Sequence, residues 1–236
     1  MQRSAADVFE QVLREKKNPK IKLLGDSITH GVGGSGWEQS GAVIVEGWSE
    51  SPNGYCWANL FRDYMKEKYG ATVVNYGCTG TRIEFVMEHF STLVESDDDL
   101  IVCTIGTNNR HQKFVDGEKL GREDFLNRLY ERMKAMFEMF QACGIPTVFV
   151  ANIPASEENE QDGDYYWRIL RMSDINDSYK RLAREQGAVV LSLYDLFSAY
   201  CSEQNCRVDD LLCDGLHPND KGYRVMFDLL VEAWKL

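Results

Sequence analysis

The run Asp99–Ile105 reads DLIVCTI and is apolar almost throughout. Strands with near-continuous apolar runs are buried on both faces, which is typical of parallel sheets. Four more short runs of this kind occur along the chain, and helical patterns separate them. They are Lys20–Gly25 (KIKLLG), Ala71–Gly77 (ATVVNYG), Ile145–Ala151 (IPTVFVA) and Ala188–Leu191. This alternation predicts an α/β fold, a three-layer αβα sandwich around a five-stranded parallel sheet.

The spacing of apolar residues between and beyond these strands is helical. It predicts helices over Ala5–Lys16, Gly54–Tyr69, Arg82–Leu93, Arg122–Cys143, Tyr165–Gln186, Leu193–Tyr200 and Pro218–Trp234. The segment Gly31–Asn53 has no clear period, and we interpret it as a long loop insertion with a small hairpin around Ala42–Val45. No linker or repeat divides the chain, so we expect residues 1–236 to form a single domain.

Composition excludes several classes of protein. The 236 residues carry 26 Lys+Arg and 37 Asp+Glu, which sum to a net charge of −11. An acidic chain repels phosphate backbones and anionic lipid heads, so we expect neither nucleic acid nor a membrane as a partner. Seven cysteines without a CxxC pair, and an N-terminus without an apolar signal region, favour a reducing, cytoplasmic location.

Polar segments follow several of the predicted strands. They are Gly25–Gly31 (GDSITHG), Asn75–Gly80 (NYGCTG) and Gly106–Asn109 (GTNN), and Asp214–Asn219 (DGLHPN) precedes the last helix. Ligands of open parallel sheets bind beyond the carboxyl ends of the strands. We therefore expect at least three of these segments to lie on one rim of the sheet.

These segments contain the groups that acyl transfer needs. Ser27 offers a hydroxyl nucleophile, which requires an adjacent base. His217 is a candidate base, and Asp214 lies three residues earlier, close enough in sequence to orient the imidazole ring. Gly80, the Asn108 amide and the Ser27 N–H are candidate donors to a developing oxyanion.

The four blocks, in this order, resemble those of the SGNH (GDSL-type) hydrolase superfamily. The first block reads GDSI rather than GDSL, and the four blocks together span Leu24 to Asn219. A single block such as GDS occurs by chance, whereas all four in order at predicted strand or helix ends make a specific pattern.

This resemblance implies a flavodoxin-like five-stranded sheet and ester hydrolysis through an acyl-enzyme. Carried over position by position, it makes Ser27 the nucleophile, His217 the base and Asp214 the partner of the base. It places the oxyanion between the Ser27 N–H, Gly80 and Asn108. The Gly31–Asn53 segment is longer than expected for a minimal member of the family.

Plainer roles exist for the same residues. Ser27 could cap a helix, since serine is a favoured N-cap. Asp26 could hydrogen-bond the surrounding loops, and His30, His89 and His111 could be ordinary loop histidines. The candidate substrate contacts are side chains near the rim or in the long loop, namely Asp26, His30, Asn109, Arg110, Trp37 and Trp48.

Two other patterns point to cofactors less well. Gly31–Gly36 matches GxGxxG, but a dinucleotide site needs the motif to join a strand directly to a helix. Cys201, Cys206 and Cys213 cluster in sequence near His217, but zinc sites use tighter ligand pairs. We therefore expect no cofactor and no metal.

The sequence thus predicts a serine ester hydrolase that acts on a short-chain acyl ester. The polar and aromatic residues of the long loop favour a small molecule or an O-acetylated carbohydrate as substrate. Two alternatives stay open: an acyltransferase that uses the same serine, and a carbohydrate-binding protein with an idle site.

Overall fold

A computed structural model describes residues 3–37, 43–45, 48–49, 53–111, 120–160 and 168–236. The sheet has five strands: β1 (Lys20–Gly25), β4 (Thr72–Gly77), β5 (Leu100–Thr104), β6 (Thr147–Ala151) and β7 (Val190–Ser192). All the pairs are parallel, and the order across the sheet is β4-β1-β5-β6-β7. This confirms the predicted five-stranded parallel sheet.

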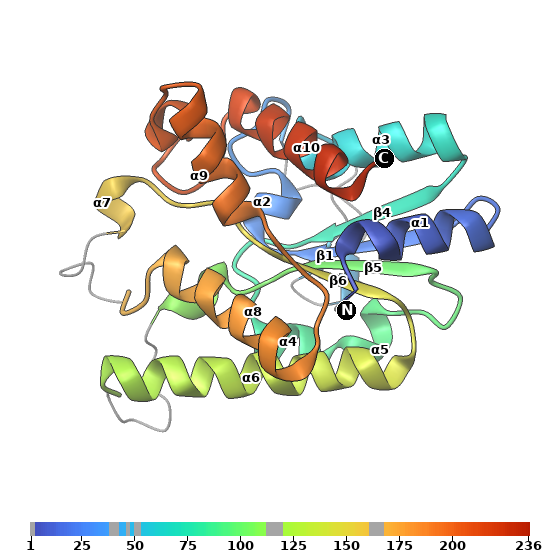
Figure 1. Cartoon of the computed structure of the whole chain (residues 1–236), viewed down its shortest axis with the longest axis horizontal. Coiled ribbons are helices and arrows are strands. Elements are labelled where there is room, and N and C mark those ends of the chain that lie inside the picture. Colours follow the sequence, from blue (N-terminus) through green and yellow to red (C-terminus); the bar gives the residue numbers. More distant parts are fainter. Residues whose placement is uncertain (1–2, 38–42, 46–47, 50–52, 112–119, 161–167) are drawn as a thin grey trace.

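Helices cover both faces of this sheet (Figure 1). One layer contains α1 (Ala5–Glu15), α3 (Trp57–Tyr69), α9 (Leu193–Glu203) and α10 (Asp220–Trp234). The opposite layer contains α4 (Ile83–Glu88), α5 (Phe90–Leu93), α6 (Arg122–Cys143) and α8 (Met172–Gln186). The remaining short elements are α2 (Ser27–His30), α7 (Glu157–Glu160), η1 (Thr107–Arg110), η2 (Val208–Leu211) and the antiparallel pair β2 (Val43–Val45) and β3 (Trp48–Ser49).

The core is divided between the two faces because successive strand side chains point to opposite sides. Leu23 of β1 packs into the layer of α1, α3, α9 and α10, and its neighbour Leu24 packs into the other layer. Val148 and Phe149 of β6 divide in the same way. Every residue of β5 is buried, as its apolar sequence indicates.

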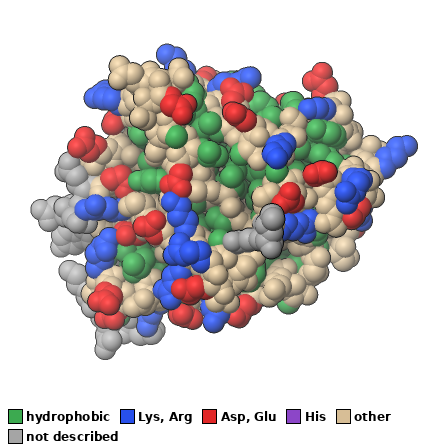
Figure 2. All heavy atoms as spheres, viewed as in Figure 1, with side chains coloured by type: hydrophobic (Ala, Val, Ile, Leu, Met, Phe, Trp, Pro, Cys, Tyr) green, Lys and Arg blue, Asp and Glu red, His purple; other side chains and the backbone are tan. Residues whose placement is uncertain are grey.

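Charged side chains of both signs are spread around the face shown in Figure 2, with hydrophobic side chains between them. The net charge of −11 is therefore not gathered into one acidic patch on this face. Within the residues that the structure describes, no helix is both long enough and apolar enough to cross a bilayer.

Several predicted boundaries differ from the structure. The helix predicted over Tyr165–Gln186 begins at Met172; residues 168–171 are not helical, and residues 161–167 lie outside the described part. The helix predicted over Arg82–Leu93 is divided into α4 and α5 at His89. The hairpin predicted around Ala42–Val45 corresponds to β2 and β3, with Ala42 itself outside the described residues.

Candidate active site

The segments that follow β4, β1 and β5 meet at one edge of the sheet. Gly25 at the end of β1 pairs with Gly77 of β4 on one side and with Thr104 of β5 on the other. The nucleophile candidate Ser27 therefore follows the strand between those that lead to Gly80 and Asn108. The sheet order thus explains why three distant segments share one site.

The first block forms the short helix α2, and Ser27 is its first residue. Its N-cap is Asp26, whose carboxylate accepts a hydrogen bond from the Ile28 N–H at 3.0 Å. The alternative in which Ser27 caps a helix is therefore wrong, because the preceding residue has that role. As the first residue of a helix, Ser27 has a backbone N–H for which the helix itself provides no acceptor.

Two glycines let α2 pack closely on the sheet. A Cβ added to Gly25 would lie 2.1 Å from Oγ1 of Thr29, and one added to Gly77 would lie 2.3 Å from the backbone N of His30. Real Cβ atoms do not approach other atoms so closely. The GDS and NYG blocks therefore need glycine at these positions so that α2, which begins with Ser27, can pack on the sheet.

Ser27, His217 and Asp214 form a continuous chain of hydrogen bonds. Nε2 of His217 lies 2.8 Å from Oγ of Ser27, and Nδ1 of His217 lies 2.7 Å from Oδ2 of Asp214. Since the carboxylate can only accept, Nδ1 carries the proton and Nε2 is left to accept the serine proton. The ring is largely enclosed, with 17% of its side chain exposed, whereas that of Asp214 is 51% exposed.

The Asp214 carboxylate is also held by its own turn. Oδ1 accepts hydrogen bonds from the backbone N–H groups of Leu216 at 3.0 Å and His217 at 2.8 Å. Partial burial acts to raise the pKa of Asp214, but these hydrogen bonds and the His217 ring outweigh it and lower the pKa. The carboxylate that faces His217 is thus kept ionised, as an orienting group must be.

The two further oxyanion candidates lie on the neighbouring loops. Gly80 is exposed, and no atom lies within 4 Å of the position that its Cβ would occupy. Asn108 is half-buried, and its Nδ2 donates to the Thr81 carbonyl at 2.9 Å. That bond ties the loop after β5 to the loop after β4 and fixes the direction of the amide, whose second N–H is not used by it.

Four of the candidate substrate contacts are buried and bound by the protein. His30 lies with its Nδ1 2.6 Å from the Gly77 carbonyl. Asn109 accepts from the Ile83 N–H at 3.0 Å and donates to Glu84 at 2.9 Å. Arg110 donates from Nε to the Thr107 carbonyl at 3.0 Å. With Asp26 these side chains support the walls of the site, and their burial disfavours direct contact with substrate.

Trp37 and Trp48 are the two candidate substrate contacts in the long loop. Trp37 is half-buried and meets the His30 ring edge-on, with 6.0 Å between the ring centroids. It therefore stays a candidate wall residue beside the nucleophile helix. The side chain of Trp48 lies outside the described residues, so its predicted substrate contact stays a prediction.

Burial sets the charge state of two of these supporting groups. Complete burial raises the pKa of the Asp26 carboxyl, against the opposing effects of hydrogen bonds from Thr107 and Ile28 and of the nearby His217 and Arg110. Burial also lowers the pKa of Arg110 to about 10, helped by the like charge of Arg168. Arg110 therefore remains a cation at neutral pH behind the loop that carries Asn108.

One supporting residue was missed in the sequence. Asn152 follows β6, is buried, and donates from Nδ2 to Asp26 Oδ2 at 3.2 Å and to Thr107 Oγ1 at 2.9 Å. It joins the N-cap of the nucleophile helix to the start of η1. Its place directly after a strand was the available signal, since the same rule had already selected the segments after the first three strands.

Comparisons with known proteins identify the family and the fold. The model of the GDSL-like lipase/acylhydrolase family matches residues 23–225, which is most of the chain. No curated protein matches. Among solved structures, a catalytic mutant of Axe2, an acetylxylan esterase from Geobacillus stearothermophilus, superposes with a TM-score of 0.69 at 14% identity, over 93% of this chain and 95% of that one. The acetyl xylan esterase AlAXEase gives a TM-score of 0.62 at 22% identity, over 91% and 98%.

Proposed function

Since this chain belongs to the GDSL-like lipase/acylhydrolase family and is a carboxylic ester hydrolase, we propose that it removes a short acyl group from a carbohydrate ester through an acyl-enzyme on Ser27. The observation that carries the proposal is the hydrogen-bonded chain from Ser27 through His217 to Asp214, at 2.8 and 2.7 Å. It is the arrangement that a serine hydroxyl needs in order to act as a nucleophile.

In the first half of the reaction, Oγ of Ser27 attacks the acyl carbon while Nε2 of His217 takes the hydroxyl proton. Asp214 stabilises the imidazolium that forms. The N–H groups of Ser27 and Gly80 and the Asn108 amide donate hydrogen bonds to the former carbonyl oxygen and stabilise its negative charge. The carbon–oxygen bond to the alcohol then breaks, and His217 returns the proton to the leaving oxygen.

In the second half, water replaces the alcohol. The water attacks the acyl-serine while His217 takes one of its protons. The same donors stabilise the negative charge of the second tetrahedral intermediate. Release of the carboxylic acid returns the proton to Ser27. Each step uses side-chain and backbone groups of this chain together with water.

An acetyl group on a sugar is the acyl ester that we favour. The polar and aromatic residues near the rim, such as Trp37 beside His30, suit a small acyl group on a polar alcohol. The two acetylxylan esterases with this fold support the same substrate class. We also propose a reducing, cytoplasmic location, which the seven free thiols favour.

The test is the dependence of turnover on acyl length and on the alcohol. Hydrolysis of p-nitrophenyl acetate, butyrate and octanoate is measured beside acetate release from acetylated xylo-oligosaccharides. We expect kcat/KM to fall as the acyl chain lengthens, and acetate to be released from the oligosaccharides. Faster turnover of the octanoate than of the acetate would refute the short-chain assignment.

A further inference from the structure

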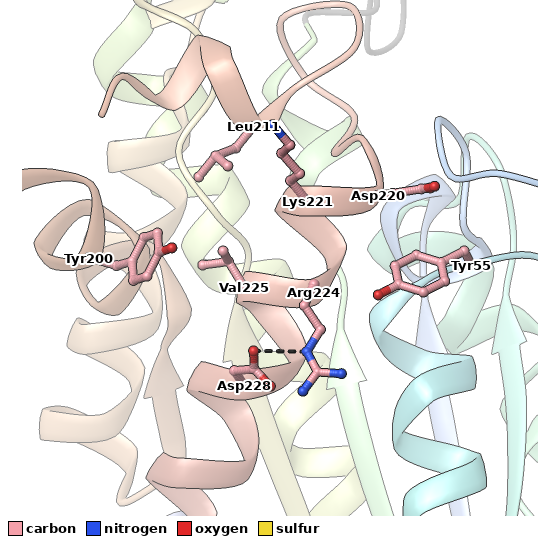
Figure 3. Close-up of a pocket in the computed structure, with 8 residues that line it drawn as sticks. All are labelled: Tyr55, Tyr200, Leu211, Asp220, Lys221, Arg224, Val225 and Asp228. Atoms are coloured by element: carbon pink, nitrogen blue, oxygen red, sulfur yellow. Dashed lines mark hydrogen bonds and ion pairs between the residues drawn. The ribbon is translucent and has the colours of Figure 1, made fainter. Parts of the chain in front are cut away.

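A groove of about 460 Å³ lies along the first half of α10. Figure 3 shows Tyr200 of α9 on one side of this helix and Tyr55, which precedes α3, on the other. The floor is formed by Val225 and Leu211, which are buried. The remaining lining residues are charged: Asp220, Lys221, Arg224 and Asp228. We refer to these eight residues as the α10 groove.

The charges of the α10 groove balance. Two carboxylates (Asp220 and Asp228) and two cations (Lys221 and Arg224) sum to zero. Nε of Arg224 donates to Oδ2 of Asp228 at 2.9 Å, so part of this charge is paired inside the groove. A surface of this kind gives no net attraction to an anion or a cation, and it favours a neutral ligand.

Hydrogen-bonding capacity remains beside these pairs. Among the described residues, the Lys221 ammonium forms no ion pair and the Tyr200 hydroxyl has no assigned hydrogen bond. The groove therefore offers donors and acceptors together with the apolar faces of two tyrosine rings. Tyrosine combines an apolar ring with a polar tip, which matches a ligand with both C–H and hydroxyl surfaces.

The groove is tied to the segments that carry the catalytic pair. Oδ1 and Oδ2 of Asp220 accept hydrogen bonds from the N–H and hydroxyl of Ser35, at 2.7 and 2.6 Å, and the Tyr55 N–H donates to the Ser35 carbonyl at 2.8 Å. Ser35 lies shortly after the nucleophile helix α2, and His217 lies three residues before Asp220. The Asp220 end of the groove is thus bonded to the segment that follows α2, and it lies three residues along the chain from His217.

The length of the groove indicates what could fill it. From Asp220 to Asp228 the helix rises eight residues, roughly 12 Å. A single acetyl ester cannot span this distance, whereas a chain of sugar units can. From this size, the balanced charge and the two tyrosines, we propose that the α10 groove binds neutral sugar units of the substrate chain beyond the acetylated unit. The inference rests on the proposed function and adds a second binding region to it.

The kinetic test compares a long substrate with a small one. For each variant, kcat/KM on acetylated xylo-oligosaccharides is divided by kcat/KM on p-nitrophenyl acetate. We expect Tyr200→Ala to lower this ratio about tenfold, mainly by raising KM, because it removes binding that is equal in the ground and transition states. Arg224→Gln should lower it as well, and it guards against a folding defect of the first variant. An unchanged ratio in both folded variants would overturn the proposal.

The matched control is Tyr69→Ala. Tyr69 ends α3 at the helix terminus opposite to Tyr55 and does not line the groove. It removes a partly buried tyrosine of the same size, so it should leave the ratio at the wild-type value. A fall as large as that of Tyr200→Ala would attribute the effect to general loss of packing and would overturn the assignment.

A binding experiment separates this inference from the proposed function. Unacetylated xylotetraose is titrated into Ser27→Ala, with and without Tyr200→Ala, at low and high salt. We expect binding that Tyr200→Ala weakens and that salt hardly changes, since the ligand is neutral. If the variants bind xylotetraose as expected but the wild-type protein has no esterase activity, the proposed function is refuted and the assignment of the α10 groove to sugar binding is retained. Esterase activity without binding, or tighter binding of an anionic oligosaccharide, would refute the groove.

Discussion

At the scale of single residues, neighbours outside the candidate catalytic set fix the positions of a few polar atoms of the site. The Leu216 N–H donates to the Asp214 carboxylate, and the Asn108 amide donates to the Thr81 carbonyl. A side chain fixed in this way is already aimed before substrate arrives, and such preorganisation is what makes hydrogen bonds effective in the transition state.

Asn108 is the residue whose replacement isolates oxyanion stabilisation. We expect Asn108→Ala to lower kcat on p-nitrophenyl acetate by roughly 10²–10³-fold, because one preorganised donor is lost. Steady-state kinetics measure the change. The control Asn127→Ala alters an exposed asparagine of α6, which is not among the candidate site residues, and should behave as wild type. Equal rates for wild type and Asn108→Ala would exclude the amide from the oxyanion site.

At the scale of secondary-structure elements, α2 is the critical piece. Four residues cannot form a stable helix alone, because helix nucleation is costly. It is held instead by Asp26 at its N-terminus and by contact with the ends of β1 and β4. Asn75 of β4 contributes by donating from Nδ2 to the Thr29 carbonyl at 2.9 Å.

Gly77→Ala tests this packing. The added Cβ would meet the backbone of Thr29 and His30, so α2 must move away from the sheet. We expect the free energy of unfolding to fall by about 1–3 kcal/mol, as at other overpacked sites. We also expect kcat of the folded variant to fall, because Ser27 moves together with α2. Urea unfolding and kinetics measure the two effects.

The matched control is Gly121→Ala. Gly121 is the exposed N-cap residue of α6, and nothing lies closer than 3.9 Å to its added Cβ. This variant should retain activity and lose at most about 1 kcal/mol, because alanine is a poorer N-cap residue than glycine. If Gly77→Ala kept wild-type activity as well, close packing of α2 would not matter to the site.

The elements also show which parts of the fold the sequence could predict. Lys20–Gly25 and Arg122–Cys143 match the observed strand and helix because local signals mark their ends. The start of α8 was predicted too early. Residues 168–171 are held by tertiary contacts, such as the Ile169 N–H to the Arg110 carbonyl at 3.0 Å, and no local pattern reveals these.

The candidate site, too, could be predicted only in part from the sequence. The four blocks predicted which segments would meet, because strand ends in a parallel sheet share one edge. They did not reveal that His30, Asn109 and Arg110 are buried. Burial of a polar side chain depends on partners far away in the chain, and helical or strand periodicity carries no information about them.

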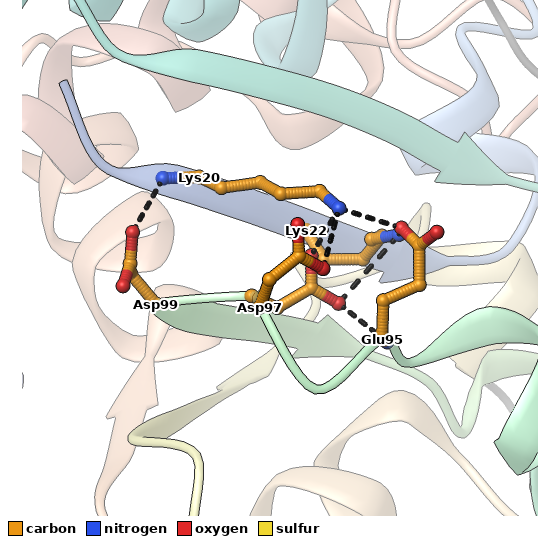
Figure 4. A network of polar contacts seen from close by, with 6 residues as sticks. Lys20, Lys22, Glu95, Asp97 and Asp99 are labelled. Atoms are coloured by element: carbon orange, nitrogen blue, oxygen red, sulfur yellow. Dashed lines mark hydrogen bonds and ion pairs between the residues drawn. The ribbon is translucent and has the colours of Figure 1, made fainter.

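At the scale of the whole molecule, the two ends of the sheet have different roles. The carboxyl ends of the strands hold the candidate catalytic residues, and the amino ends hold a network of charges (Figure 4). Lys22 of β1 is fully buried, and its Nζ lies 2.9 Å from Glu95 and 3.6 Å from the buried Asp98. Lys20 joins the same carboxylates, so the two lysines of β1 offset part of the negative charge of the acidic loop before β5.

This network makes stability depend on pH. Hydrogen bonds from Lys20 and Lys22 lower the pKa of Glu95 from 4.5 to about 2. A lowered pKa means that the ionised group stabilises the fold fully above pH 4.5, and that this contribution is lost as the pH falls from there toward 2. Because half of the Glu95 side chain is exposed, solvent limits the contribution to about 1 kcal/mol.

Glu95→Gln should therefore flatten the pH dependence of stability. Urea midpoints at pH 7, 5, 4 and 3 should fall less steeply below pH 5 than those of the wild-type protein. Glu138→Gln, an exposed site on α6, serves as the control and should follow the wild-type curve. Parallel curves for Glu95→Gln and wild type would contradict the role given to this ion pair.

The most direct test of the central claim is the hydrolysis of p-nitrophenyl acetate by wild type and Ser27→Ala, measured side by side on folded protein. We expect clear turnover by wild type and a loss of several orders of magnitude in the variant, because the proposed nucleophile is removed. Activity of Ser27→Ala equal to that of wild type would contradict the assignment of Ser27 and of the site built around it.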